Sequence, residues 1–320
     1  MIDTRSLITP HLIRNKNFYV AYSGGVDSTV LLKEVCEAAK KVNCNVTAIH
    51  INHGYSKFSD NWEQHCEKFC IEHDYPLQKF SLNIAEAEGA SLESAMREKR
   101  YEIFQSLIGK NETLFMGHHL DDQIETLFFR ILRGSGLKGS SSIPFKRNLG
   151  KGLLVRPFLN LSKKEIYEIA KLKKLKFIED ESNKDIKFDR NFLRNEVIEK
   201  ISERWPNYRK SLSKYIENQK SSHEFLKEIT TIELKKILHG KNIDVNKLKK
   251  YDSKYQKILI LQWLEMNNCN SPSSSALNEL TKFFVSSEKT KEPKFIWGSK
   301  EKGNYICLKI KKGIISIESN

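Results

Sequence analysis

The stretch FYVAYSGGVDS, residues 18–28, decides how this chain folds. FYVAYS (18–23) is a run of aromatic and β-branched residues typical of a buried strand, and a helical pattern follows from about Asp27. Between them, consecutive glycines let backbone amides approach an anion closely, and the positive end of the helix points to the same place. SGGVDS (23–28) therefore predicts a phosphate-binding loop, although it lacks the GxxxxGK[ST] pattern and the lysine of a Walker A loop.

Strand and helix patterns alternate on the C-terminal side of this loop. Further strands are expected at 46–52, 77–82, 113–119 and 153–158. Helices are expected at 27–41, 60–73, 91–108, 121–133 and 162–173. Such alternation favours right-handed crossovers and a parallel sheet with helices on both faces. The Gly-, Ser- and Lys-rich segment 133–152 is interpreted as a loop that becomes ordered on binding.

The pattern changes near position 189. It is helical to about 239, and Pro206 is expected in the first turn of a new helix. Two helices at 254–266 and 274–286 and three short strands at 294–298, 304–310 and 314–319 follow. The predicted organisation is an α/β fold with a parallel-sheet domain at 1–188, a helical linker region at 189–240 and a small α+β domain at 241–320.

Composition and charge limit the class of protein. The 54 basic and 40 acidic residues give a net charge of +14, and the 10% of aromatic residues exclude a disordered chain. No apolar run is long enough to span a membrane, and no secretory signal is visible, so a cytoplasmic protein is expected. Residues 205–320 carry 22 basic and 12 acidic side chains, almost all the basic ones lysine. Such lysines suit a phosphate backbone, but a merely solvated surface explains them equally well.

The six cysteines are too sparse for a disulfide scaffold, which agrees with a reducing compartment. Cys66 and Cys70 lie near two histidines, as in some metal sites. They also lie at helical spacing with Trp62 and Phe69, and there is no second Cys pair at zinc-ribbon spacing. Core packing is therefore the preferred interpretation.

Asp27 is the most informative residue of the loop. A carboxylate beside a polyphosphate is repelled unless a divalent cation bridges the two, and Mg²⁺ prefers one or two carboxylates together with phosphate oxygens. The alternative is an ordinary strand-turn-helix junction in which Asp27 is the N-cap. The sequence favours a Mg²⁺ site at Asp27.

A second cluster follows the fourth expected strand in GHHLDDQIETLFFRILRGSG (117–136). Asp122 and Glu125 share a helical face one turn from its N-terminus, where they could hold an ammonium group or a second Mg²⁺. The alternative is a capping pair, with Asp122 as N-cap and Glu125 reaching back. His118 and His119 could equally be strand-end residues that pack under the loop. Further candidates from later segments are Arg156, Asn183, Arg190 and Arg194, of which the last two could clamp a phosphate.

SGGVDS resembles the PP-loop of the N-type ATP pyrophosphatases, which cleave ATP between the α and β phosphates and transfer AMP to an oxygen. From about residue 17 to residue 205 the chain is similar, more specifically, to the tRNA(Ile)-lysidine synthetase family. The segments that carry this resemblance, in the order of the family, are SGGVDS, ESAMREKRY (93–101), HHLDDQIET, RGSGLKG, RPFL and ESNKDIKFDRNFLR. Related thiolating enzymes use paired cysteines near the loop, and no CxxC occurs here.

The resemblance implies a PP-loop ATP pyrophosphatase domain that uses ATP, Mg²⁺ and L-lysine. The family modifies the cytidine at the first anticodon position of a tRNA(Ile) with a CAU anticodon. Asp27, Asp122 and Arg190 are then expected to be catalytic, with Mg²⁺ on Asp27 and lysine on Asp122 and Glu125. ATP is expected on Ser23, Gly24, Gly25, Val26, Asp27 and Ser28. Contacts to tRNA are expected from the 241–320 domain and from Arg133, Arg194, Arg209 and Lys210.

Two other functions stay open. One is another PP-loop tRNA modifier, such as a 2-thiocytidine synthase, which the missing cysteine pair disfavours. The other is a non-catalytic RNA-binding protein that keeps ATP as a structural ligand, which the presence of Asp27, Asp122 and Glu125 disfavours. The sequence indicates nothing about the oligomeric state.

Overall fold

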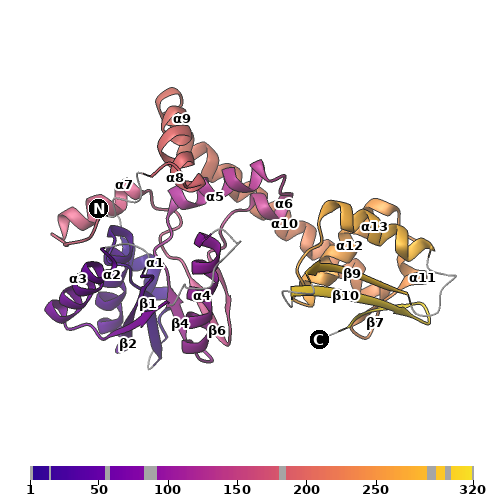
Figure 1. Ribbon diagram of the computed structural model, residues 1–320, viewed down its shortest axis with the longest axis horizontal. Helices are drawn as coiled ribbons and strands as arrows, with labels where there is room; N and C mark the ends of the chain where they lie inside the picture. Colours follow the sequence, from indigo (N-terminus) through magenta and orange to yellow (C-terminus); the bar gives the residue numbers. More distant parts are fainter. Residues whose placement is uncertain are drawn as a thin grey trace. The chain divides into compact units, whose positions relative to one another are not determined.

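The computed structural model describes residues 3–13, 16–54, 58–82, 92–179, 185–286, 293–299 and 304–318. The chain forms two compact units, Met1–Lys220 and Ser221–Asn320 (Figure 1). The boundary between them falls within one long helix. The division predicted from the sequence, at 188 and 240, stays a prediction.

A six-stranded sheet organises the first unit. Its order is β3-β2-β1-β4-β6-β5, and all neighbours are parallel except the antiparallel pair β5 and β6. The strand bounds are β1 Asn17–Ala21, β2 Asn45–Asn52, β3 Leu77–Ser81, β4 Thr113–Phe115, β5 Lys146–Leu149 and β6 Gly152–Val155. The predicted parallel sheet is confirmed, and β1 lies near its middle, so SGGVDS begins at the carboxyl edge of the sheet, where open α/β folds bind ligands.

Helices connect these strands, and each expected helix before position 189 is present with both ends within two residues. The bounds are α1 Thr4–Ile8, η1 Thr9–His11, α2 Val26–Val42, α3 Ser59–His73, α4 Leu92–Leu107, α5 Leu120–Leu132, α6 Leu137–Ser140 and α7 Lys163–Leu172. The short helix α1 was not expected.

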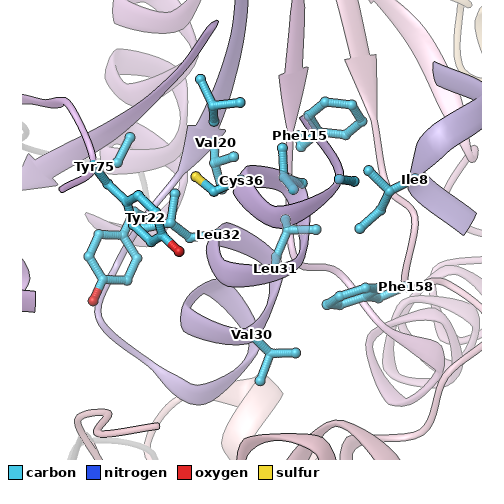
Figure 2. Close-up of a cluster of buried hydrophobic side chains, with 14 of the residues drawn as sticks. Ile8, Val20, Tyr22, Val30, Leu31, Leu32, Cys36, Tyr75, Phe115 and Phe158 are labelled. Carbon is cyan, nitrogen blue, oxygen red and sulfur yellow. The ribbon is translucent and has the colours of Figure 1, made fainter. Parts of the chain in front are cut away.

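The two faces of the sheet pack against different helices. On one face, α2, α3 and α7 bury apolar side chains against alternate strand residues such as Val20 and Phe115. Figure 2 shows Leu31 and Leu32 of α2 in this cluster. On the other face, α4 packs onto β2 and β4 through residues such as Phe104. Since strand side chains alternate between faces, the near-continuous apolar runs of the sequence supply both cores.

The interpretation of residues 133–152 as a loop was wrong in part. The segment contains α6 and the edge strand β5, which pairs antiparallel with β6 in the register Lys146↔Val155 to Leu149↔Gly152. The strand KRNL is mostly exposed and carries two cations, so it lacks the apolar pattern by which the inner strands were recognised. Its charges suit an edge strand, because they discourage pairing with another chain.

The region after position 189 is helical, as predicted. It comprises α8 Asp189–Phe192, the π-helix η3 Leu193–Ile198, α9 Glu199–Arg204 and the long helix α10 Tyr208–Ile237. Pro206 precedes α10 by two residues and does not lie in its first turn. Tyr208 packs with Ile124 and Ile198 in a small core cluster, which fixes the start of α10 within the first unit.

The second unit contains a five-stranded antiparallel sheet in the order β7-β8-β11-β10-β9, with a core around Trp263 and Leu308. The three strands expected at the C-terminal end are confirmed, and β7 and β8 are additional. The bounds are β7 Leu238–His239, β8 Asn242–Asp244, α11 Val245–Leu248, α12 Ser253–Met266, α13 Ser274–Ser286, β9 Lys294–Ser299, β10 Asn304–Lys311 and β11 Ile314–Glu318. Throughout the residues that the structure describes, every helix is too short or too polar to cross a membrane.

Candidate active site

The loop SGGVDS turns from β1 into α2, and its own hydroxyl groups hold it in shape. The Ser28 hydroxyl donates to the Gly25 carbonyl oxygen at 3.0 Å and accepts from the Ser23 backbone N–H at 3.1 Å. Gly25 is the N-cap of α2 and has no side chain to bond the first amides of the helix. These amides are therefore available to an anion at the positive end of the helix.

Two glycines allow close approaches that a larger residue would prevent. Gly24 has φ +84°, and a Cβ there would lie 2.8 Å from Ile178 Cδ1 and 2.9 Å from Cys66 Sγ. The Gly24 carbonyl oxygen accepts from the Ile178 backbone N–H at 2.9 Å. At Gly117, just past β4, a Cβ would lie 3.1 Å from the backbone carbonyl of Asp27. Close contacts with Ile178, Cys66 and Gly117 therefore fix the position of the loop.

Asp27 is partly buried and lies at the mouth of this loop. Its Oδ2 is 3.7 Å from Nε2 of His119, and its buried Oδ1 has no hydrogen-bond partner among the described residues. Burial raises the pKa of Asp27, and the neighbouring His119 opposes this shift.

An uncompensated carboxylate oxygen beside a phosphate-binding loop is a suitable ligand for Mg²⁺. Within the described residues, no group of three or more His, Cys, Asp and Glu side chains could hold a metal ion alone.

The N-terminus of α5 is capped by His119, not by Asp122. The His119 ring accepts from the Asp122 backbone N–H at 3.4 Å, and the Asp122 carboxylate accepts from the His119 backbone N–H at 2.9 Å. The capping alternative considered for Asp122 and Glu125 was therefore wrong in its pairing: Asp122 is the third helical residue, and Glu125 takes no part. Sequence reasoning missed this role because His is an uncommon N-cap.

Glu125 is 1% exposed and is held by two arginines. Its Oε2 accepts from Arg190 Nε at 2.7 Å, and its Oε1 accepts from Arg194 Nε at 2.7 Å. Arg190 also donates to Asp122 Oδ1 at 3.1 Å. Burial raises the pKa of Asp122, but His119 and Arg190 outweigh this effect and lower it below its ordinary value. The two pairs that the sequence singled out, Asp122 with Glu125 and Arg190 with Arg194, thus form one ionic network around the buried Glu125, and the two arginines bind this carboxylate.

The π-helix η3 belongs to this arrangement. Arg190 precedes it in α8 and Arg194 lies within it, and both reach the same carboxylate of Glu125. Short π-helical turns occur often at functional sites, because they redirect side chains that a regular helix would present elsewhere.

The remaining predicted cations lie in different surroundings. Arg209 donates to Asp121 Oδ1 at 2.8 Å, and Asp121 also accepts from the Lys163 backbone N–H at 2.8 Å, which ties α5 to α7 and α10. Arg133 and Lys210 are exposed, and Arg133 lies over the ring of Phe129. Asn183 lies outside the described residues.

A pocket of about 200 Å³ opens beside the loop. Its lining includes the apolar residues Ile49, Ile51, Phe104 and Met116 and the loop residues Ser23, Gly25, Asp27 and Ser28. Arg100, His53 and His118 also line it. The sequence drew attention to ESAMREKRY but not to Arg100 itself, because no motif rule distinguishes that arginine from its neighbours.

His118 contacts the buried Arg156. Arg156 Nε donates to His118 Nδ1 at 3.1 Å, so the ring proton of a neutral His118 lies on Nε2. Burial lowers the pKa of His118 well below its ordinary value, which keeps the ring neutral.

Cys66 and Cys70 are buried in the core beside Tyr22 and Phe69. Burial raises the pKa of both thiols to about 12, so they remain protonated and poor metal ligands. The predicted core packing of Cys66 and Cys70 is confirmed.

A six-stranded α/β sheet with SGGVDS at its carboxyl edge defines an ATP-binding PP-loop domain, and the PP-loop domain family matches residues 3–201. A curated tRNA(Ile)-lysidine synthase of Coxiella burnetii is 32% identical over 84% of this chain and 60% of its own length. One of Legionella pneumophila is 32% identical over 93% of this chain and 69% of its own. The chain therefore belongs to the tRNA(Ile)-lysidine synthase family of PP-loop proteins.

The fold is also found in a solved structure, the U34-tRNA thiolase of Methanococcus maripaludis, with a TM-score of 0.53 and 19% identity over 68% of this chain and 77% of that one. This similarity concerns the fold alone. The chain spans about three-fifths of the length of the Coxiella relative.

Proposed function

We propose that this chain ligates L-lysine to C2 of the cytidine at the first anticodon position of a tRNA(Ile) with a CAU anticodon. One observation carries the proposal. Nε2 of His119 lies 3.7 Å from Asp27 Oδ2 and 3.6 Å from Asp122 Oδ2. The phosphate loop, through Asp27, and one carboxylate suited to an ammonium group, Asp122, thus meet at one imidazole, which would help to bring an amine to an adenylated base.

ATP is proposed to bind with its phosphates on the backbone of Ser23–Ser28. The free amides at the start of α2 and the adjacent pocket of about 200 Å³ support this proposal. Mg²⁺, held by Asp27 and phosphate oxygens, would neutralise charge on the departing pyrophosphate. Val26 is buried and would support the loop by packing, while its backbone contributes to the phosphate contacts.

The proposed reaction has two steps. The cytosine O2 attacks the α-phosphorus of ATP, forming an O–P bond as the bond to the β-phosphate oxygen breaks and pyrophosphate leaves. The lysine ε-amine then attacks C2, the C–O bond breaks, AMP leaves, and the amine loses a proton. The base has to leave its stack to reach the pocket.

Asp122 and Glu125 are proposed to orient the lysine, and Arg190 to stabilise the negative charge that develops on the phosphate. Because Arg190 already bonds both carboxylates, an incoming ammonium competes with its guanidinium. Lysine binding would then release Arg190 toward the phosphate. His119, between Asp27 and Asp122, is suited to keep these two carboxylates apart.

Contacts to the tRNA are proposed from Arg133 and Lys210, which are exposed, and from Arg194 and Arg209. The last two would have to share their guanidinium groups with Glu125 and Asp121. The second unit, with 18 lysines and 11 acidic residues, would add phosphate contacts, and a cytoplasmic location follows from the tRNA substrate.

Incubation with ATP, Mg²⁺, labelled lysine and total tRNA, followed by nucleoside analysis, tests the proposal. Lysidine in the digested tRNA, with equimolar AMP release, is the expected result. A thiolated cytidine that depends on a sulfur donor would identify a 2-thiocytidine synthase instead. Tight tRNA binding without AMP release would identify a non-catalytic RNA-binding protein.

A further inference from the structure

Eight arginines of the first unit form two groups that differ in their partners. Arg5, Arg190, Arg194 and Arg209 each form an ion pair with a carboxylate. In the second group, Arg97, Arg147 and Arg156 lie around Tyr101 of α4, and Arg130 lies near Arg97; the described residues provide none of these four with a carboxylate partner.

The aromatic ring of Tyr101 is the centre of the second group. The guanidinium carbon of Arg97 lies 5.3 Å from the ring centroid and that of Arg147 lies 4.6 Å from it. Arg97 comes from α4 and Arg147 from the edge strand β5, and both side chains are exposed. A tyrosine ring can stabilise a nearby cation, but two guanidinium groups at one ring also repel each other.

Buried charge beneath this surface adds to the positive field. Arg156 is 2% exposed, and it donates to two neutral acceptors: His118 Nδ1 at 3.1 Å and the Pro144 carbonyl oxygen at 2.7 Å. Arg130 likewise donates only to the carbonyl oxygens of Gly139 and Ser142.

The pKa shifts of Arg156 and Tyr101 agree with an excess of positive charge around Tyr101. Burial lowers the pKa of Arg156 and Tyr101 opposes this shift, but Arg147 and Arg97 lower it further, so the pKa lies below its ordinary value. Burial raises the pKa of Tyr101, yet Arg97, Arg156 and Arg147 together bring it below its ordinary value. Such an excess of positive charge is stabilised best by an anion from outside the protein.

The group lies next to the proposed ATP pocket. Arg156 contacts His118, which lines the pocket, and Tyr101 follows the pocket residue Arg100 in α4. The exposed pair Arg97 and Arg147 therefore lies outside the pocket, next to its wall. The phosphates of ATP already have a proposed binding loop at Ser23–Ser28, so the anion at Arg97 and Arg147 needs a different source.

We propose that Arg97 and Arg147, with Tyr101 between them and Arg130 and Arg156 as fixed background charge, bind a backbone phosphate of the RNA beside the nucleotide whose base enters the pocket. The proposal rests on the proposed function, because that function brings a single-stranded anticodon loop to the pocket. Guanidinium groups held against an aromatic ring suit RNA, since they offer both a phosphate fork and a stacking plane.

The test is filter binding of tRNA to the full chain across about 50–200 mM salt, for the wild type and for Arg97→Ala/Arg147→Ala. Both side chains are exposed, and unchanged ATP binding verifies the fold. The control is Lys68→Ala/Lys171→Ala, which removes the same charge from exposed positions on α3 and α7, against the other face of the sheet. We expect the arginine variant to lower the salt slope by about 1 for each side chain and tRNA affinity by about tenfold or more, and the control to change little.

A third variant, Arg97→Lys/Arg147→Lys, should retain most of the salt slope but lose part of the affinity, because lysine keeps the charge without the fork. Equal affinities and slopes for wild type and the alanine variant would overturn the proposal. Weaker ATP binding with unchanged tRNA binding would overturn it too, because the anion would then be a phosphate of ATP. Because binding is measured without turnover, an absence of lysidine would contradict the proposed function but not this site.

Discussion

Arg190 donates a 2.7 Å hydrogen bond to Glu125 across 65 residues of sequence, and Arg194 donates to the same carboxylate from the π-helix. A buried carboxylate with two guanidinium groups is costly to disturb, because removal of one partner leaves an uncompensated charge. The network therefore fixes the start of α5 relative to α8 and η3. Arg190 also bonds both carboxylates that are proposed to bind lysine, so it would compete with the lysine ammonium for them.

Asp27→Ala should abolish AMP and pyrophosphate formation and leave tRNA affinity within a few-fold of wild type. The reason is the unpaired Asp27 Oδ1, which is proposed to bind Mg²⁺. This cation would offset the repulsion between the Asp27 carboxylate and the triphosphate. Pyrophosphate release is measured against Mg²⁺ concentration. Wild-type rates in the variant at saturating Mg²⁺ would contradict the role given to Asp27.

Glu125→Gln should raise the apparent KM for lysine by about tenfold or more while changing the KM for ATP much less. A neutral amide loses the charge-assisted contact to an ammonium. Asp121→Asn is the matched control, because it removes a charge from the same helix but from a residue that contacts Arg209. An unchanged KM for lysine would leave Glu125 with a structural role only.

Gly24→Ala should weaken ATP binding and lower the melting temperature. A left-handed φ of +84° costs an L-residue about 1–3 kcal/mol, and the new Cβ would overlap Ile178 and Cys66. Gly136→Ala is the control, since Gly136 has a negative φ and a Cβ at this position would have no atom within 4 Å among the described residues. The melting temperature and the ATP affinity of both variants are measured by thermal unfolding and ATP titration. Equal decreases in the two variants would contradict a special requirement for glycine at position 24.

Glu37→Gln should destabilise the protein near neutral pH. Glu37 bonds Arg5 at 2.6 Å and Lys173 at 2.9 Å. Burial raises its pKa, but Lys173 and Arg5 outweigh burial and lower it to about 2. Its contribution, about 1–3 kcal/mol, is therefore complete above its unfolded pKa of about 4.3 and is lost as the pH falls toward 2.

Denaturant unfolding of the Glu37→Gln variant at pH 7 and pH 3 measures this effect. The difference from wild type should be smaller at pH 3. Glu168→Gln, an exposed change on α7, should differ little from wild type at either pH. A deficit that does not depend on pH would mean that the ionic contacts of Glu37 are not what stabilises the fold.

A chain that ends at Lys220 should bind ATP like the full chain but lose most of its tRNA affinity. The endpoint follows from the core, because Tyr208 and Leu212 pack with Ile124 and Ile198 and would be lost by a cut before α10. The second unit carries 18 lysines, so its removal should also flatten the salt dependence of tRNA binding. Identical slopes for both chains would assign the tRNA contacts to the first unit.

The sequence predicted those features that depend on local pattern. Apolar runs revealed the inner strands, and SGGVDS revealed the loop, because both are contiguous. The edge strand KRNL escaped notice because an exposed strand needs no apolar alternation. The pairing of Glu125 with Arg190 joins residues 65 positions apart, and a single sequence carries no signal for such a contact. The alternation of β-branched runs with helical patterns was enough to predict the fold class, but it could not predict the ionic network around Glu125.

The π-helix η3 also restricts how this chain can change in length. Its six residues, Leu193–Ile198, begin three positions after Arg190, which is held by Glu125. They end at Ile198, whose side chain packs with Tyr208. Deletion of one residue would rotate all that follows by about 100° and carry Ile198 away from its neighbours. Insertions and deletions should therefore accumulate on either side of this turn and be rare within it.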